Sequence, residues 1–444
     1  MSTSTGPTPQ DLGNAPRRVL VIAYYFPPMA YSGVQRVLKF VKYLPQHGWR
    51  PTVLTVDPAG YYQFDETMES EIAGLGIDVH RVESSDPTRL FGRKHKVEMP
   101  GEKRRRVASM ISQSLFIPDN KIGWKRAAVK KGIEILQAGE YDAIFSSAPP
   151  YTAHLIGMEL SRRSDVPLVT DFRDDWVGNP RHFYLTAWHK NRHQLLESEV
   201  IKASSAVTVI NRPIHDRLIV RNLGPEGYHK VSMIPQGYDA DDFNSSHPGP
   251  DPKQLRLTYT GIFYDVQTPE YFLKALSSLL ERRPELRKAF VAEFVGHLPK
   301  KELQRITDLG LDKVVEYKGY LPHRESVERL QAADILWMTV GRRAGNETIS
   351  TGKLFEYMGA RKPILGLVPQ GAAADALERY GAFFRAAPDD PSAIAAALES
   401  LYEAWRRNDL PTPNESFAGS FDRSKTAGTL ARVLLSTIHA DSIL

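Results

Sequence analysis

The chain has 444 residues, of which 42% are hydrophobic and 25% charged, and its formal net charge at pH 7 is +5. This composition is typical of a soluble globular protein and excludes a mainly disordered chain. The sequence contains no cysteine, which excludes disulfides, thiolate zinc sites and cysteine nucleophiles. Because 444 residues exceed what one hydrophobic core supports, we expect two domains of about 200 residues each.

The amino-terminal residues 1–16 are small and polar and have no apolar core of a signal peptide. They are predicted to form a disordered tail. The sequence has no stretch of about 18 apolar residues, so it predicts a cytoplasmic protein. The positive net charge fits an anionic partner, which is a nucleotide, a nucleic acid or a lipid headgroup.

The first predicted domain spans residues 17–246. Residues 17–23 form a continuous apolar run after two arginines, which is typical of a strand buried on both faces of a parallel sheet. Apolar residues at helical spacing follow in 34–43, and residues 51–56 read as a second strand. Further strands are predicted at residues 143–146, 168–171, 206–210 and 231–234.

A segment rich in proline and glycine, residues 247–254, is predicted to be a linker. A second α/β domain is predicted for residues 255–415. Residues 416–444 are expected to form a return helix, because Leu430 and Leu434 lie on one helical face. The strands predicted in the second domain are residues 255–259, 292–295, 314–318, 335–338 and 363–367.

A glycine follows the first predicted strand, directly before the first helix. Gly33 would let backbone amides approach a phosphate or a sugar at the positive end of the helix dipole. The alternative is that Gly33 serves the turn alone. The dinucleotide motif G-x-G-x-x-G is absent, which argues against an oxidoreductase that uses such a cofactor.

In the second domain a polar loop runs into a predicted helix. Ser350 or Thr351 is predicted to cap this helix, leaving the amides near Gly352 and Lys353 beside the lysine charge, where a diphosphate would bind. Glu356, one turn further along, is placed to accept hydrogen bonds from both hydroxyls of a ribose. The alternative is a solvated helix start with a surface Lys/Glu pair.

Four motifs occur in an order that is similar to one known family. Residues 32–35 (Ser-Gly-Val-Gln) resemble its Gly-Gly-Val-Gln loop, and residues 234–239 resemble its Ile-Pro-Asn-Gly-Val-Asp segment. Gly261 resembles the glycine that opens its donor domain, and residues 353–364 resemble its donor helix and the following strand. The chain thus resembles the family 4-like retaining glycosyltransferases, which include bacterial mannosyl-, glucosyl- and N-acetylglucosaminyltransferases.

The resemblance implies the α/β fold called GT-B, in which two Rossmann-like domains face a central cleft and a carboxy-terminal helix packs back across them. It also implies a nucleotide-sugar donor on the second domain, an acceptor on the first, and retention of anomeric configuration. The nucleoside diphosphate sugar would be a co-substrate, and no other cofactor is expected.

The sequence departs from the family at two positions. Thr348 stands where the first of two signature glutamates is expected, so only Glu356 matches. Residues 262–267 lack the arginine and lysine that commonly follow the donor-domain glycine. Neutralisation of the diphosphate is then expected from Lys353 with Arg342 or Arg343.

In many relatives, histidines follow the fourth and fifth strands of the first domain. Ser147 and Arg173 occupy those positions here, and residues 171–176 (Asp-Phe-Arg-Asp-Asp-Trp) are expected to form a sugar-binding wall rather than a solvated loop. His154 lies on a predicted helix, where a structural histidine is favoured over a catalytic one. The predicted catalytic residues are Lys353, Arg342, Arg173 and Asp171; the donor-binding residues are Gly33, Gly261, Arg343, Gly352, Lys353 and Glu356; the acceptor-binding residues are Ser32, Ser147, Asp174 and Trp176.

Two further features remain. Asp239 and Asp241 have the spacing of a metal-binding aspartate pair, but their place before the linker argues against a metal site. Basic residues 93–96 and 103–106 flank a predicted helix with Val107, Met110, Ile111 and Leu115 on one face. This helix either lies on an anionic membrane or faces the core. No nucleic-acid recognition motif accompanies the charge.

The sequence therefore predicts transfer of a sugar to a hydroxyl of a glycan or lipid-linked glycan in polysaccharide biosynthesis. The protein would be cytoplasmic or peripheral at the inner face of the membrane. The alternatives are a nucleotide-sugar 2-epimerase of the same fold and a non-catalytic protein that binds a nucleotide sugar or a polysaccharide.

Overall fold

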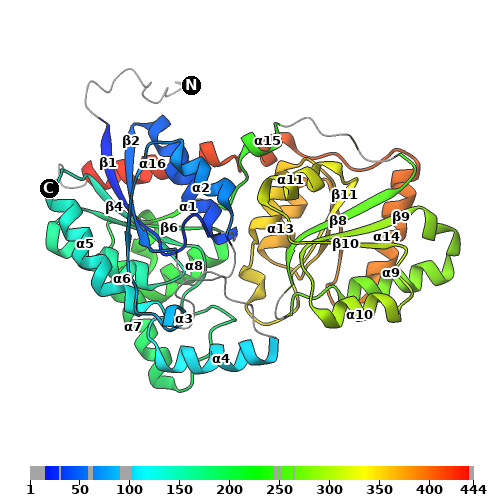
Figure 1. Ribbon diagram of the computed structural model, residues 1–444, viewed down its shortest axis with the longest axis horizontal. Helices are drawn as coiled ribbons and strands as arrows, with labels where there is room; N and C mark the ends of the chain where they lie inside the picture. Colours follow the sequence, from blue (N-terminus) through cyan, green and yellow to red (C-terminus); the bar gives the residue numbers. More distant parts are fainter. Residues whose placement is uncertain are drawn as a thin grey trace.

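The computed structural model describes residues 16–29, 32–58, 64–90, 102–244, 249, 252–263 and 266–439. Two parallel sheets lie side by side, one in each half of the chain (Figure 1). The N-terminal sheet has the order β3-β2-β1-β4-β5-β6-β7, and the C-terminal sheet has the order β10-β9-β8-β11-β12-β13. Strand order reverses beside β1 and β8, and ligands of α/β proteins bind beyond the carboxyl ends of strands at such points.

In the N-terminal half the central strands are buried on both faces, which explains their continuous apolar runs. Its strands are β1 (Arg17–Ile22), β2 (Trp49–Val56), β3 (Asp78–Val82), β4 (Ala143–Ala148), β5 (Leu168–Phe172), β6 (Ala206–Val209) and β7 (Val231–Met233). Its helices are α1 (Ser32–Tyr43), α2 (Glu66–Ala73), α3 (Pro87–Leu90), α4 (Glu102–Leu115), α5 (Lys125–Gln137), α6 (Thr152–Ser164), α7 (Ala187–Ala203) and α8 (Arg212–Asn222).

The C-terminal half repeats the alternation of strands and helices around its own apolar core. Its strands are β8 (Leu255–Ile262), β9 (Phe290–His297), β10 (Val315–Gly319), β11 (Ile335–Thr339), β12 (Ile364–Leu367) and β13 (Phe383–Ala386). Its helices are α9 (Glu270–Arg282), α10 (Lys300–Asp308), α11 (His323–Ala332), α12 (Gly352–Gly359), α13 (Ala372–Tyr380), α14 (Pro391–Arg406) and α15 (Glu415–Gly419).

The last helix, α16 (Arg423–His439), returns to the N-terminal half and lies against α1 (Figure 1). Leu430 and Leu434 are completely buried in the N-terminal core. The predicted return helix is thereby confirmed. A backbone bridge between Tyr238 and Asp422 joins its entry to the end of the N-terminal half.

Each strand predicted from the sequence is present, and two further strands occur at sheet edges. These are β3 and β13, in which only Ala386 is buried and whose sequences include polar residues. The predicted tail lies almost entirely in residues 1–15, and half of the predicted linker lies in residues 247–248 and 250–251. Both stretches are outside the described residues, so the domain boundaries remain predictions.

Candidate functional site

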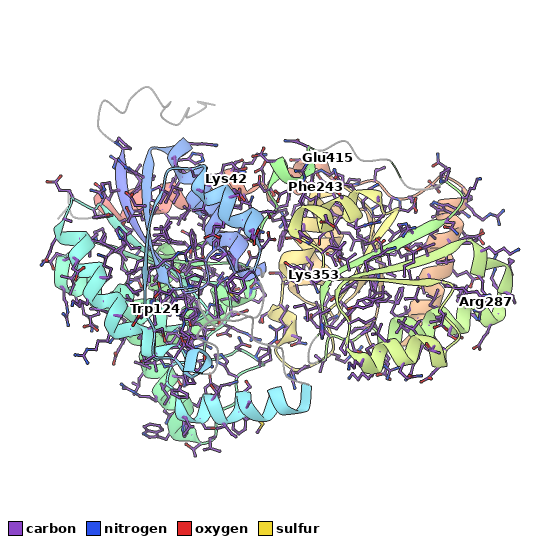
Figure 2. All side chains as sticks on the ribbon, in the orientation of Figure 1. Lys42, Trp124, Phe243, Arg287, Lys353 and Glu415 are labelled. Atoms are coloured by element: carbon purple, nitrogen blue, oxygen red, sulfur yellow. The ribbon has the colours of Figure 1, made fainter. Side chains whose placement is uncertain are left out.

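Lys353 lies on the side of the C-terminal half that faces the N-terminal half (Figure 2). It is in the first turn of α12, and its Nζ donates a hydrogen bond to Tyr259 Oη over 2.5 Å. The same nitrogen lies 4.3 Å from the centre of the Tyr259 ring. The side chain thus reaches from α12 to the carboxyl end of β8.

Gly261 makes this reach possible. Its φ of +121° is in the region that favours glycine. A Cβ at this position would lie closer to Lys353 Cε than two carbon atoms can approach. The glycine that opens the second domain therefore leaves room for the lysine chain as well as for the backbone turn.

The environment of Lys353 alters its protonation. Burial lowers its pKa to about 7, the charge of Arg181 acts in the same direction, and the charge of Glu356 opposes both. A bound diphosphate would favour the charged amine. Lys353 can therefore change charge near neutral pH in response to an anion.

The start of α12 differs from the predicted capped helix. Thr351 occupies the N-cap position, but no side chain caps the helix, and Ser350 Oγ instead accepts a hydrogen bond from Asn211 Nδ2 over 3.0 Å. The prediction that Ser350 or Thr351 caps α12 is therefore wrong. No atom lies within 4 Å of a Cβ built at Gly352, so the helix start borders open space. First-turn amides without a side-chain cap can bind an anion.

Glu356 is half-buried one turn beyond Lys353. Its carboxylate forms no hydrogen bond or ion pair with any residue that the structure describes. His323 and Arg423 are near enough for its charge to affect them. Burial acts to lower the pKa of His323, but the hydrogen bond to Asp242 and the charge of Glu356 outweigh it and raise the pKa.

The two arginines predicted to assist Lys353 differ in their surroundings. Arg342 Nε forms an ion pair with Asp389 Oδ2 over 3.1 Å, and its side chain is 63% exposed. In the structure Arg342 therefore pairs with the carboxylate of Asp389 at the surface, whereas the sequence predicted that it would bind the diphosphate. Arg343 is half-buried in the loop that follows β11. Thr348, at the position of the missing signature glutamate, is buried, and its Oγ1 donates to the carbonyl of Gly345 over 2.9 Å.

In the N-terminal half, Arg173 holds three segments of the chain together. Its guanidinium donates to the carbonyl oxygens of Gly33, Ala148 (3.1 Å) and Pro149 (2.5 Å). Arg173 directly follows β5, Gly33 lies in the first turn of α1, and Ala148 and Pro149 lie at the end of β4. Arg173 is thereby a positioning residue for the start of α1. The side chain of the preceding residue, Ser32, lies outside the described side chains.

Asp171 was predicted to be catalytic, but it is fully buried and its oxygens are occupied. Arg36 binds both carboxylate oxygens, over 3.0 and 2.8 Å, and Ser147 and Thr208 donate to them over 2.8 and 2.7 Å. Burial acts to raise the pKa of Asp171, but Arg36 and the hydroxyls outweigh it and lower the pKa. Asp171 and Ser147 are thus buried and hydrogen-bonded to each other, and their described contacts hold neighbouring strands of the sheet together.

Trp176 does not form the expected sugar-binding wall, because its side chain is 0% exposed. It stacks on Tyr151 with ring centres 4.4 Å apart and donates from Nε1 to His193 Nδ1 over 3.0 Å. The neighbouring Asp174 is half-buried, and no residue that the structure describes binds its carboxylate. Burial raises the pKa of Asp174, and Arg181 and Arg173 oppose that effect.

His154 is buried on α6, as favoured for a structural histidine. Its Nδ1 lies 2.8 Å from Ser146 Oγ, and burial lowers its pKa to about 3. Its Nε2 has no hydrogen-bond partner in the described part of the chain.

Several residues that join the two halves were not predicted. Asn211 binds the loop before α12, and Arg217 Nη2 pairs with Glu347 Oε1 over 2.6 Å. A Cβ at Gly345 would lie 3.0 Å from Pro180, so the segment after β5 reaches the loop after β11. Arg181 follows Pro180 and acts electrostatically on Lys353. Contacts between such distant segments have no signal in the sequence.

The aspartate pair before the linker is engaged by lysines. Lys42 Nζ lies 2.9 Å from both Asp239 Oδ2 and Asp241 Oδ2, and Lys39 Nζ lies 2.6 Å from Asp239. Within the described ranges, no group of three or more acidic, histidine or cysteine residues could hold a metal ion. Nor is any helix of those ranges long and apolar enough to span a membrane.

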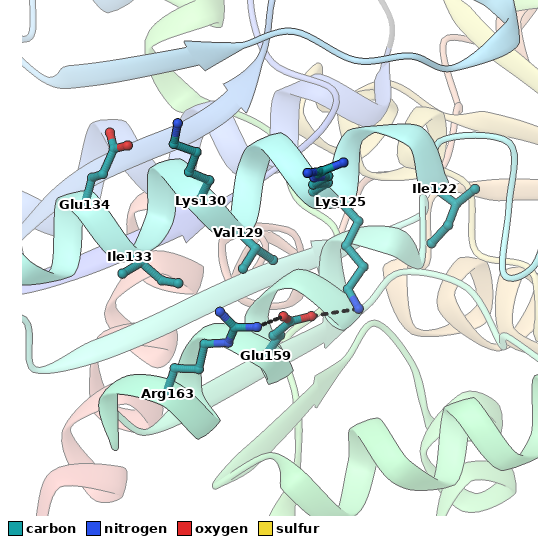
Figure 3. A pocket seen from close by; sticks show the side chains of 9 residues that line it. Ile122, Lys125, Val129, Lys130, Ile133, Glu134, Glu159 and Arg163 are labelled. Carbon is teal, nitrogen blue, oxygen red and sulfur yellow. Dashed lines mark hydrogen bonds and ion pairs between the residues drawn. The ribbon is translucent and has the colours of Figure 1, made fainter.

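A separate hollow of about 610 Å³ lies on the outside of the N-terminal half, between α5 and α6 (Figure 3). Glu159 pairs there with Lys125 over 2.8 Å and with Arg163 over 2.5 Å. None of the predicted site residues lines this hollow.

Comparison with known families decides the class of protein. Residues 33–237 match the glycosyl transferase 4-like domain, and residues 254–404 match the glycosyl transferases group 1 domain. The chain belongs to the glycosyl transferase 4-like family. It is a nucleotide-sugar-dependent glycosyltransferase with the GT-B fold.

Two curated relatives are described as D-inositol 3-phosphate glycosyltransferase. The one from Pseudarthrobacter chlorophenolicus is 23% identical over 409 residues, which cover 83% of this chain and 92% of the relative. The one from Paenarthrobacter aurescens is 24% identical over 302 residues, covering 65% of this chain and 71% of the relative.

Solved structures are similar in fold. Anabaena HepE in complex with UDP-glucose has a TM-score of 0.59 at 15% identity and covers 96% of this chain and 100% of its own. A glycosyltransferase from Rickettsia africae has a TM-score of 0.57 at 13% identity, covering 96% and 97%. A UDP-N-acetylglucosamine 2-epimerase from Listeria monocytogenes, described as putative, has a TM-score of 0.55 at 12% identity, covering 96% of both chains. At these identities the likeness concerns the fold alone.

Proposed function

We propose that the protein transfers a sugar, with retention of configuration and without a metal ion, from a nucleoside diphosphate sugar to a hydroxyl of a glycan or lipid-linked glycan. The observation that carries the proposal is the position of Lys353. Its amine lies between the uncapped start of α12 and the glycine turn at the end of β8. A diphosphate at this position would meet both the amine and the helix amides.

In this proposal the donor lies along α12. The amides of Gly352 and Lys353 and the lysine amine stabilise the negative charge that develops on the departing diphosphate. Glu356, whose carboxylate has no partner among the described residues, accepts the ribose hydroxyls. The acceptor oxygen bonds to the anomeric carbon as the bond to the diphosphate breaks, and a phosphate oxygen of the departing diphosphate takes the proton of the acceptor hydroxyl, so no protein base is required.

The acceptor would approach from the N-terminal half, beside the segments that Arg173 holds together. Asp174 offers a carboxylate there that no described residue binds. Hydrogen bonds from sugar hydroxyls would satisfy this carboxylate. Membership of the family supports a nucleotide-sugar donor. The proposed acceptor is instead supported by the Asp174 carboxylate and the segments that Arg173 holds together.

The experiment is a donor panel followed by product analysis. Nucleotide sugars that raise the melting temperature are incubated with glycan and polyol phosphate acceptors, the latter because two relatives are named for inositol 3-phosphate. We expect sugar on a new molecule with its anomeric configuration retained. Epimerised free donor without transfer would identify a 2-epimerase, and binding without turnover of any donor would identify a non-catalytic protein. Inversion of the anomeric centre, or loss of activity on chelation of divalent cations, would contradict the proposed route.

A further inference from the structure

One surface of the N-terminal half carries an unusual share of the exposed large hydrophobic residues. It is formed by the carboxyl end of α4, the segment before α7 and the first half of α7, and we call it the α4–α7 surface. Its exposed hydrophobic residues are Ile111 (55%), Leu115 (71%), Leu185 (57%), Trp188 (63%) and Leu195 (56%). The alternative in which α4 faces the core is therefore wrong for Ile111 and Leu115. The side chain of Val107 is not among those that the structure describes.

These residues lie on elements that contact one another. Gln113 Oε1 accepts a hydrogen bond from the Phe183 amide over 2.6 Å, and His189 Nε2 lies 3.2 Å from the carbonyl oxygen of Ser114. The first contact fastens the end of α4 to the segment before α7, and the second fastens it to the first turn of α7. The two helices share the lower end of the N-terminal half in Figure 1. The exposed side chains thus form one surface.

The helix α7 has two apolar faces. Its inner face buries Leu196 and Val200. Trp188 and Leu195 are seven residues apart, so they lie on one face of the helix, and both are exposed. An outer apolar face of this kind is expected where a helix contacts something besides its own core.

The charge of the surface has one sign. Residues 108–115 and 185–195 contain no aspartate or glutamate, and their basic residues are His189, Lys190, Arg192 and His193. Of these, Lys190 and Arg192 are exposed beside Trp188 on α7. A second copy of the chain would bring two cationic surfaces together, which opposes a symmetric dimer.

We infer that the α4–α7 surface binds an anionic lipid bilayer. Tryptophan and leucine side chains enter the headgroup boundary, and lysine and arginine are attracted by anionic lipids. Residues 179–184 lead from this surface to the contact between Pro180 and Gly345. The bilayer would therefore lie next to the junction of the two halves, which is where a lipid-linked acceptor has to arrive.

Trp188 provides a direct probe. Of the six tryptophans, Trp49, Trp124, Trp176 and Trp337 are buried and Trp405 is half-buried, so Trp188 is the exposed one. Phosphatidylcholine vesicles that contain phosphatidylglycerol should shift the tryptophan emission to the blue and protect it from acrylamide. Vesicles of phosphatidylcholine alone should do so weakly, and salt should reverse the effect. The variant Trp188→Phe should lose the shift and keep the binding.

Variants then test which residues bind. Replacement of Trp188 and Leu195 by serine should weaken cosedimentation with anionic vesicles at least about tenfold, and Lys190→Gln with Arg192→Gln should do the same at low salt. Val220→Ser is the matched control, because Val220 is 83% exposed on α8. Donor binding should be unchanged in every variant, which separates this inference from the proposed function. A wild-type protein that ignores anionic vesicles at low salt, or a Trp188 shift that follows protein concentration without lipid, would overturn the inference.

Discussion

Asn211 in the N-terminal half donates a hydrogen bond from Nδ2 to the backbone carbonyl of Thr348 in the C-terminal half, over 2.7 Å. The same nitrogen donates to Ser350 Oγ over 3.0 Å. On its other side, Asn211 Oδ1 accepts from the Ile214 amide over 3.1 Å and caps α8. One side chain therefore caps a helix and holds the loop that leads into the donor helix.

Replacement of Asn211 by aspartate separates these two tasks. Aspartate keeps the oxygen that caps α8 but has no N–H for Thr348. A net hydrogen bond contributes about 0.5–1.5 kcal/mol, so the loss of two should lower kcat/KM about five- to tenfold or more while the melting temperature changes little. Asn414→Asp is the control, because Asn414 Oδ1 caps α15 through the Phe417 amide. Equal kcat/KM in both variants would exclude a role of this contact in the site.

The pair of Asp171 and Arg36 is expected to stabilise the fold without taking part in transfer. Asp171→Asn leaves the buried guanidinium without its charge partner, which should cost about 3–5 kcal/mol in the free energy of unfolding. The pKa of Asp171 is lowered in the folded state. Its contribution is therefore present above the pKa of the unfolded state and is lost as the pH falls through the lower folded pKa. Urea unfolding of wild type and variant at neutral and acid pH measures both effects. A variant with normal stability and no turnover would restore the catalytic assignment.

The fold was largely predictable because most strands of a parallel sheet are buried on both faces and read as apolar runs. Leu168–Phe172 and Ile335–Thr339 are buried at every position. The edge strands were missed for the opposite reason. Asp78–Val82 has an exposed first residue and partly buried successors, so polar residues interrupt its apolar pattern.

The candidate site was predictable where its residues are close in sequence. Lys353 and Glu356 follow from helix spacing, and Gly261, although distant from them in sequence, follows from the family motif. Arg36 and Asn211 were missed, because their partners lie more than 100 residues away along the chain. Trp176 was misread for a related reason, since a tryptophan next to three aspartates in sequence is buried against Tyr151 in space.

The pKa of Lys353 predicts how donor binding depends on pH. With a pKa of about 7 in the free protein, Lys353 is charged below that pH and neutral above it. A diphosphate favours the charged amine and raises its pKa. Donor affinity should therefore be highest below about pH 7 and fall by up to about tenfold per pH unit above it. Near pH 8 the binding of donor should take up a proton, which calorimetry in buffers of different ionisation enthalpy detects.

Lys353→Met is the matched variant for this measurement. It should bind donor at least about tenfold more weakly and take up no proton. The same lowered pKa acts on stability, because the unfolded lysine titrates near 10.5. The free energy of unfolding of the ligand-free protein should then rise with pH between about 7 and 10.5 through this group, and the rise should be absent in Lys353→Met. Proton uptake that persists in the variant would assign the titration to another residue.

The last prediction concerns Glu356 and the ribose. If its carboxylate accepts the two hydroxyls, Glu356→Gln keeps the shape of the side chain and loses charge-assisted hydrogen bonds, which contribute about 1.5–3 kcal/mol each. The variant should bind a ribonucleotide much more weakly. Its effect on a 2′-deoxyribonucleotide should be smaller, because that ligand already lacks one of the hydroxyls.

Glu316→Gln provides the control for a carboxylate outside the site, since Glu316 pairs with Lys318 over 3.0 Å on β10. Titration of wild type and Glu356→Gln with both nucleotides completes a double-difference cycle. A contact with the ribose predicts a coupling of at least about 1 kcal/mol, whereas a solvated helix glutamate changes the binding of both ligands by the same amount, within about 0.5 kcal/mol. A coupling of zero would therefore remove Glu356 from the donor site and leave Lys353 and the helix amides as its described anchors.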